Sequence, residues 1–134
     1  MARTHTDMVR DLFDRWNRGV IELPEGETHP EIEIVSRTSK LRGRPYRGLQ
    51  EAEHWIRDML DSFDEWTLHA DEFEDVSPTR LLVVGSVRYR GRGSGAAMDM
   101  PAAWIFDFEG GRCRRLETFS QRVEEARRVA RSAT

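Results

Sequence analysis

The chain has 134 residues, 38% hydrophobic and 34% charged, which is the balance of a soluble globular domain, and we expect a single domain spanning residues 1–134. All but one of the 21 basic residues are arginines, yet 24 acidic residues leave a net charge of −3, which argues against nucleic acid as a partner. One cysteine, no signal-peptide-like start and no long apolar run predict a cytoplasmic protein without a disulfide or a membrane span.

The first half of the chain carries two amphipathic helical patterns. Apolar residues at steps of three and four predict a helix from Asp7 to Arg18. Two prolines and a glycine in residues 20–30 indicate a connecting loop with at most a turn or two of helix. Alternating residues then predict a strand over 31–38, followed by a loop over 40–48. The second helix, over 52–63, has the strongest periodicity in the sequence.

The second half is rich in β patterns. Apolar residues alternate from Trp66 and change parity before Phe73, which predicts a strand containing a bulge. Three further strands are predicted over 81–91, 96–108 and 112–121, joined by the turns GRGSG and EGGR, and a short amphipathic helix follows from Val123. Helices alternating with a run of antiparallel strands predict an α+β fold, with one twisted, mainly antiparallel sheet and the helices packed on one face, forming a cone that encloses a pocket.

Six segments occur in an order that is typical of one protein family. They are LFDRWNRG, HPEIEI, YRGLQEAEHWIRDML, DEFEDV, VRYRGRGSG and WIFDFEGGRCRRLETF. Between about Val9 and Ala130 the chain therefore resembles SnoaL-like proteins of the nuclear transport factor 2-like (NTF2-like) superfamily. The resemblance implies a cystatin-like cone with a mostly apolar pocket, and a homodimer formed through the sheet. Members include steroid isomerases, polyketide cyclases, epoxide hydrolases, dehydratases and proteins with no known reaction, so the resemblance alone does not define the chemistry.

The catalytic positions of that superfamily carry other residue types here. The Asp base of the steroid isomerases corresponds to Ser36, their acidic oxyanion partner to Ala103 and their first-helix Tyr to Leu12. The Asp of the cyclases corresponds to Thr118. The resemblance therefore predicts neither a ketosteroid isomerase nor an Asp-dependent cyclase, because both reactions need a positioned carboxylate base.

Two carboxylates in predicted strands are candidates for acid or base catalysis. Asp99 lies in mid-strand between two methionines, where burial would raise its pKa and make it a general base. The alternative is a cross-strand ion pair with an arginine or a place at the pocket rim. Glu117 is the second candidate, and the interpretation we favour for it is a salt bridge with Arg88 or Arg90.

No metal or cofactor is predicted. The four histidines lie in separate segments without metal-ligand spacing, and the GRGSG segment lacks the Lys and the helix start of a phosphate loop. Cys113 has no signature of a nucleophile. Arginines alternate in the sequence VRYRGR and again at Arg112 and Arg114, so each set shares a sheet face. This pattern allows capture of an anion, although acidic residues favour a charge-balanced surface.

These observations predict a protein that binds a small, largely apolar molecule in a cone pocket. The expected lining residues are Leu12, Trp16, Trp55, Met59, Ala103, Leu116 and Thr118, with Trp55 the foremost among them. One alternative is an isomerase, cyclase or hydrolase that acts by acid–base chemistry on a polyketide-like or terpenoid substrate. Another is a structural dimerisation module. Apolar residues on both faces of strands 81–91 and 96–108 predict a homodimer through the exposed sheet face.

Overall fold

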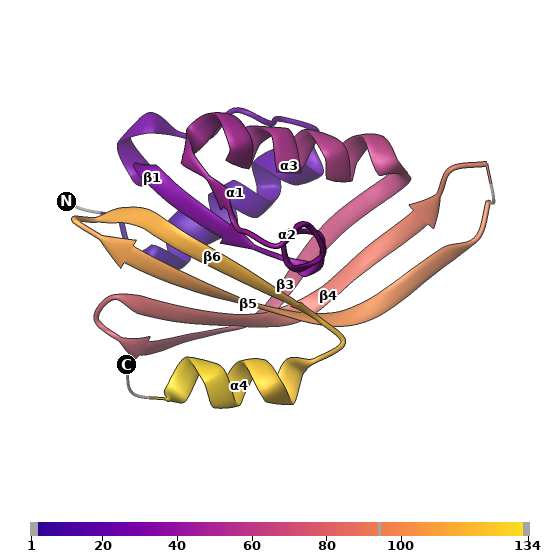
Figure 1. Ribbon diagram of the computed structural model, residues 1–134. Helices are drawn as coiled ribbons and strands as arrows, with labels where there is room; N and C mark the ends of the chain where they lie inside the picture. The colour runs from indigo at the N-terminus through magenta and orange to yellow at the C-terminus, as the bar shows by residue number, and fades with distance from the viewer. Residues whose placement is uncertain (1–2, 94, 133–134) are drawn as a thin grey trace.

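A computed structural model describes residues 3–93 and 95–132 (Figure 1). The helices are α1 (His5–Asn17), α2 (Arg37–Arg42), α3 (Gly48–Ser62) and α4 (Val123–Arg131), with a 3₁₀ turn η1 (Glu25–Glu27). The strands are β1 (Thr28–Val35), β2 (Tyr46–Arg47), β3 (Phe63–Ser77), β4 (Arg80–Gly91), β5 (Ala97–Glu109) and β6 (Arg112–Ser120).

The six strands form one twisted sheet in the order β2-β1-β6-β5-β4-β3. Every neighbouring pair is antiparallel except β1 and β6, which run parallel. Figure 1 shows α1 and α3 on one side of the sheet, called here the inner face, and α4 on the other side, called the outer face. The predicted α+β fold with a mainly antiparallel sheet is confirmed.

The α4 helix differs from the expectation that all helices pack on one face. Strand alternation sends Leu81 and Val83 to the inner core but Leu82 and Val84 to a second core, which also holds Ala103, Ile105 and Phe119. The small residues Ala126 and Ala130 let α4 lie close against this second core. The apolar outer-face residues that suggested a homodimer are therefore buried by the chain's own helix.

A short helix, α2, occupies part of the segment that was predicted to be a loop. Six residues are too few to show an amphipathic pattern in the sequence. The helix is stabilised by hydrogen bonds at its N-terminus. The Ser36 side chain accepts a hydrogen bond from the Ser39 backbone N–H, and the Ser39 hydroxyl in turn accepts one from the Ser36 N–H, which is a capping box. The helix ends at Gly43, which adopts the left-handed conformation.

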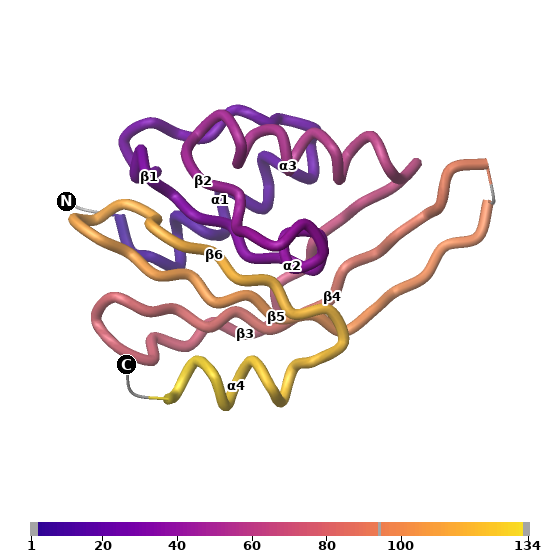
Figure 2. Tube along the Cα trace, in the orientation of Figure 1, coloured from indigo at the N-terminus to yellow at the C-terminus, as the bar shows by residue number. Residues whose placement is uncertain are grey.

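The predicted bulge in β3 is confirmed and lies between Ala70 and Glu72. It brings β3 against Gly85 of β4, where an added Cβ atom would lie 1.9 Å from the His69 carbonyl oxygen. Glycine is therefore the residue that fits at position 85 without moving the neighbouring strand. The Cα trace in Figure 2 shows the ends of β4 and β5 that face each other continuing past the body of the domain as a long, bent ribbon.

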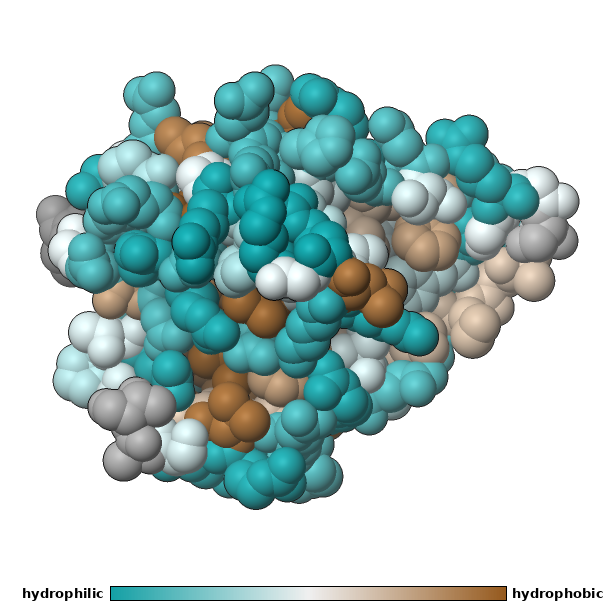
Figure 3. Space-filling model, in the orientation of Figure 1, coloured by the Kyte–Doolittle hydropathy of each residue, from teal (hydrophilic) through white to brown (hydrophobic). Residues whose placement is uncertain are grey.

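The surface view in Figure 3 is mainly hydrophilic, with small separate hydrophobic patches. Among the described residues, the exposed large hydrophobic side chains are Leu41 and Met98. No helix in the described ranges is long and apolar enough to cross a bilayer.

Candidate functional site

Aromatic side chains fill most of the space between the inner face and the two covering helices. Trp16 of α1 is 1% exposed and packs against Trp55 of α3 and Trp66 of β3, with ring centroids 6.1 and 6.0 Å away. Phe13 lies 4.8 Å from Trp104 in an edge-to-face arrangement. Such contacts make this region between the inner face and the helices a packed core, because interlocking rings leave little room for a ligand.

An apolar cavity lies on the inner face, between α1, the segment around η1, β1, β5 and β6. Its volume is about 20 Å³. Its wall consists of Met8, Val9, Leu12, Trp16, Leu23, Pro24, Glu27, Thr28, Ile32, Ile34, Phe106, Phe108, Cys113 and Leu116. A cavity of about 10–15 Å³ holds one water molecule and one of about 150 Å³ holds benzene, so this cavity has room for a single small group.

Few polar groups belong to the cavity wall. The Glu27 carboxylate forms an ion pair with Arg3, with 2.9 Å between Oε2 and Nε. Burial raises the pKa of the Cys113 thiol to about 12, and its Sγ lies 3.9 Å from the Arg115 carbonyl oxygen, to which it donates. The buried indole nitrogen of Trp16, Nε1, has no hydrogen-bond partner among the described residues. The residues of the wall thus combine an apolar body with an ion-paired carboxylate, the hydroxyl of Thr28, a protonated thiol and an unpaired indole N–H.

Three of the residues predicted to bind a ligand, Leu12, Trp16 and Leu116, line this cavity. Trp55 and Met59 do not, although both pack in the inner core. Trp16 lies in the cavity wall and also contacts Trp55, so Trp55 packs behind it. Trp55 therefore lies outside this cavity wall, and its role as a pocket residue stays a prediction, since helical periodicity identifies the buried side of α3 but not what that side meets.

The two remaining predicted ligand-binding residues, Ala103 and Thr118, also lie outside the cavity wall. Ala103 pairs with Val84 and Phe119 and faces α4 on the outer side of the sheet, so its assignment to the pocket is wrong. Thr118 is half-buried and shares the strand parity of Leu116. Thr118 therefore lies on the inner face but outside the cavity wall. For Ala103 the sequence predicts the strand but not the face, which changes with every one-residue shift in register.

Asp99, the first candidate base, is opposite Arg88 in the β4–β5 ladder. Its Oδ2 atom lies 2.8 Å from Arg88 Nη1, and its side chain is 62% exposed. A solvated, ion-paired carboxylate is not set up as a base for a ligand in the cavity, because neither desolvation nor proximity assists it. The alternative interpretation, a cross-strand ion pair, describes its geometry.

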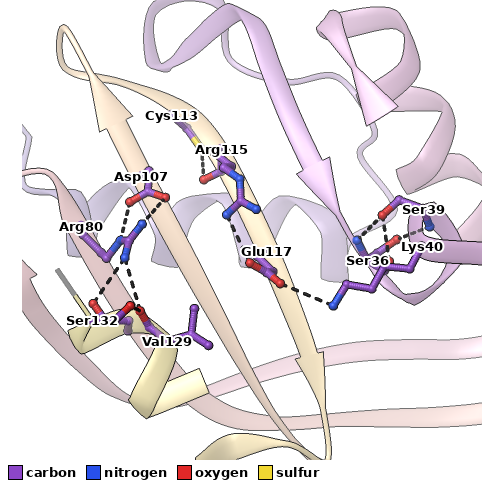
Figure 4. Close-up of polar contacts among 11 residues, drawn as sticks. Ser36, Ser39, Lys40, Arg80, Asp107, Cys113, Arg115, Glu117, Val129 and Ser132 are labelled. Carbon is purple, nitrogen blue, oxygen red and sulfur yellow. Dashed lines mark hydrogen bonds and ion pairs between the residues drawn. The ribbon is translucent and has the colours of Figure 1, made fainter. Parts of the chain in front are cut away.

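Glu117, the second candidate, is more buried but also lies away from the cavity wall. Its carboxylate lies 3.2 Å from Arg115 Nη1 and 3.6 Å from Lys40 Nζ (Figure 4). The predicted partners Arg88 and Arg90 are wrong, since both arginines pair with Glu65. Glu117 thus joins β6 to α2 through a salt bridge, in the structural role that we favoured over catalysis.

A neighbouring ion pair on the outer face fastens α4. Arg80 Nε lies 2.7 Å from Asp107 Oδ1, and Arg80 Nη1 donates to the carbonyl oxygens of Val129 and Ala130 at 3.5 and 3.4 Å (Figure 4). A cation at these C-terminal carbonyls also interacts favourably with the helix dipole. Acidic partners therefore balance the outer-face arginines, as the composition suggested. No group of three or more potential metal ligands occurs in the ranges 3–93 and 95–132.

Sequence reasoning missed Glu27, Met8, Leu23 and Cys113 as cavity residues. Glu27 lies in the loop between α1 and β1, where no periodic pattern assigns a direction to a side chain. Cys113 reaches the inner face because the β5–β6 register shifts between Asp107 and Phe108. Such a bulge alters the parity of a strand, and only strand pairing reveals it.

No protein-family model and no curated protein sequence matches the chain. Solved structures do match in fold. An NTF2-like protein of unknown function from Burkholderia pseudomallei is 21% identical over 95% of this chain and 97% of its own, with a TM-score of 0.75. A putative SnoaL-like polyketide cyclase from Jannaschia sp. is 13% identical over 100% and 99%, with a TM-score of 0.73.

A third structure is that of an epoxide hydrolase/cyclase-like enzyme with a role in forming the pyran ring of the polyether salinomycin. It is 11% identical over 86% of this chain and 88% of its own, with a TM-score of 0.70. Together with the sheet order and helix positions, these likenesses show that the chain has the NTF2-like fold, as the sequence segments suggested. At identities this low the fold is shared and the chemistry has to be argued from the cavity.

Proposed function

We propose that the chain is a SnoaL-like protein that binds a small, largely apolar molecule at the cavity beneath α1. The observation that carries the proposal is the composition of the wall, in which twelve of the fourteen residues have apolar side chains, counting Pro24 and Cys113. An apolar cavity with a few polar groups is the usual form of a small-molecule site. The fold neighbours include cyclase-like proteins, which supports this use of the cone.

The size of the cavity determines how binding has to occur. At about 20 Å³ it admits one small group, so a whole ligand enters only if part of the wall moves outward. Leu12 and Pro24 are half-buried, and η1 is a single 3₁₀ turn on a connecting segment. The strands on the opposite wall are held by ladder hydrogen bonds on both sides. The α1–η1 wall is therefore the side that opens, since loops and short turns have lower local stability than a sheet.

A titration of ¹⁵N-labelled protein with methylenecyclopentane tests the proposal. We expect saturable chemical-shift changes centred on residues of the cavity wall. In the variant Leu12→Phe the larger ring fills the cavity and binding weakens at least tenfold. The matched control is Leu60→Phe, because Leu60 is half-buried against the same core but outside the cavity wall. Absence of saturable shifts in the wild type, or equal weakening in both variants, contradicts the proposed site.

Acid–base catalysis is a second candidate, and it is supported by the presence of Glu27 in the wall rather than by Asp99 or Glu117. Unlike Asp99, Glu27 lies at the cavity, and once a ligand displaces its partner Arg3 its carboxylate can take a proton from water. That water would open a small epoxide to a diol, with the epoxide oxygen taking up a proton. Cyclohexene oxide is a suitable test substrate, with diol measured by gas chromatography. Hydrolysis above the buffer rate that is lost in Glu27→Gln supports this candidate. Equal rates in wild type, variant and buffer contradict catalysis by Glu27 and leave ligand binding as the proposed function.

A further inference from the structure

The indole N–H of Trp16 is a hydrogen-bond donor with nothing to bind. Its nitrogen is buried and has no hydrogen-bond partner among the described residues. Buried Trp N–H groups normally have a partner, and a buried donor without one is unfavourable because it has lost its water. The group therefore calls for an explanation beyond core packing.

The surrounding rings keep Trp16 from turning to find an acceptor elsewhere. Its ring is stacked on Trp66, meets Trp55 nearly edge-on at 75° and also contacts Phe13. The donor is consequently fixed in a residue that belongs to the cavity wall. Of the other polar residues of the wall, Glu27 is paired with Arg3 and the Cys113 thiol donates to a carbonyl oxygen, while the buried Thr28 contributes a hydroxyl.

We infer that the ligand carries one neutral acceptor oxygen, a ketone, ester, ether or epoxide oxygen on an apolar body, and that this oxygen accepts from Trp16 Nε1. The inference rests on the proposed function and specifies its ligand class. An anionic head group is disfavoured, because Trp16 supplies a neutral donor and the nearby Arg3 is already paired with Glu27. A purely hydrocarbon ligand would leave the N–H unpaired.

The experiment compares cyclopentanone with methylenecyclopentane, which have nearly the same shape but carry an oxygen and a CH₂ group at the same place. Water solvates the ketone better, so the informative quantity is the ratio of the two affinities in each variant. Trp16→Phe removes the N–H and keeps an aromatic ring. We expect it to weaken ketone binding relative to alkene binding roughly three- to tenfold. Trp55→Phe, which removes an indole outside the cavity wall, should leave the ratio unchanged.

A second readout uses the wild type alone. Of the four Trp indole N–H signals, that of Trp16 should move downfield with cyclopentanone and not with methylenecyclopentane. The signal is assigned by its loss in Trp16→Phe or, if that variant does not fold, by elimination using Phe variants of the other three. If both compounds bind but the ratio and the indole signal do not respond, the inference is wrong and the proposed function stands. If neither compound binds, both the inference and the proposed function are wrong.

Discussion

Trp55→Ala tests whether Trp55 belongs to the core or to a pocket. The ring is 4% exposed and meets Trp16 and Trp66 edge-to-face, with centroids 6.1 and 6.2 Å apart. Fully packed aromatic residues lose about 3–5 kcal/mol on truncation to Ala, through lost burial and the cavity left behind. For 134 residues an unfolding entropy of about 2.1 cal/mol/K per residue means that this loss lowers Tm by roughly 10–18 °C.

Urea denaturation followed by far-ultraviolet circular dichroism gives the free-energy difference, and a thermal melt gives the shift in Tm. Trp55→Phe is the matched control and should lose clearly less, because a ring still fills most of the site. A loss below about 1.5 kcal/mol for Trp55→Ala would refute the packed core and restore Trp55 as a residue at an open cavity. A variant that is unfolded at 25 °C agrees with the reasoning if Trp55→Phe remains folded.

Four further outcomes are expected. Gly85→Ala should lose about 3 kcal/mol or more in urea denaturation because its Cβ would collide with the His69 carbonyl, whereas Gly26→Ala, with open space around it, should change little. The Cys113 thiol should not react with Ellman's reagent at pH 8 until the protein unfolds; because burial raises its pKa from 9.0 to about 12, the folded state holds the proton longer, and the free energy of unfolding should fall as the pH rises from about 9 to 12. A 5-ene-3-ketosteroid should isomerise at the buffer rate, since no carboxylate base stands at the matching catalytic positions and Asp99 is exposed and paired with Arg88; turnover that depends on Asp99 would show our assignment of the sheet faces to be wrong. The homodimer remains a proposal; sedimentation equilibrium at micromolar concentration tests it, and a clean monomer would agree with burial of the apolar outer face by α4.

The sequence predicts elements whose stability is local. The α3 helix follows from its apolar stripe, and the β3 bulge follows from a change of parity between Trp66 and Phe73. The α2 helix was missed because six residues held by a capping box at Ser36 carry no periodic signal. The start of α1 was placed at Asp7, whereas Thr4 caps the helix and His5 begins it, because the sequence offers two threonines at the right distance.

The site was only partly predictable, since it depends on which strand face each residue occupies. Leu12, Trp16 and Leu116 follow from helix periodicity and from strand alternation. Ala103 was assigned to the wrong side, because β5 is apolar on both faces and only the position of α4 distinguishes them. Glu27 comes from an irregular segment, for which no general pattern relates sequence to side-chain direction.

The parallel pairing of β1 with β6 affects how the chain can fold during synthesis on the ribosome. Thr28 pairs with Cys113 and Val35 with Glu117, so the strand that pairs with β1 along its length is translated about eighty residues after it. Until then Ile32 and Ile34, both destined for the inner core, have only the two-residue strand β2 beside them. Translation at about 5–20 residues per second leaves this apolar segment accessible for several seconds. We therefore expect the segment of β1 to be open to chaperone binding until β6 has left the exit tunnel, and closure of the sheet between β1 and β6 to come late in folding.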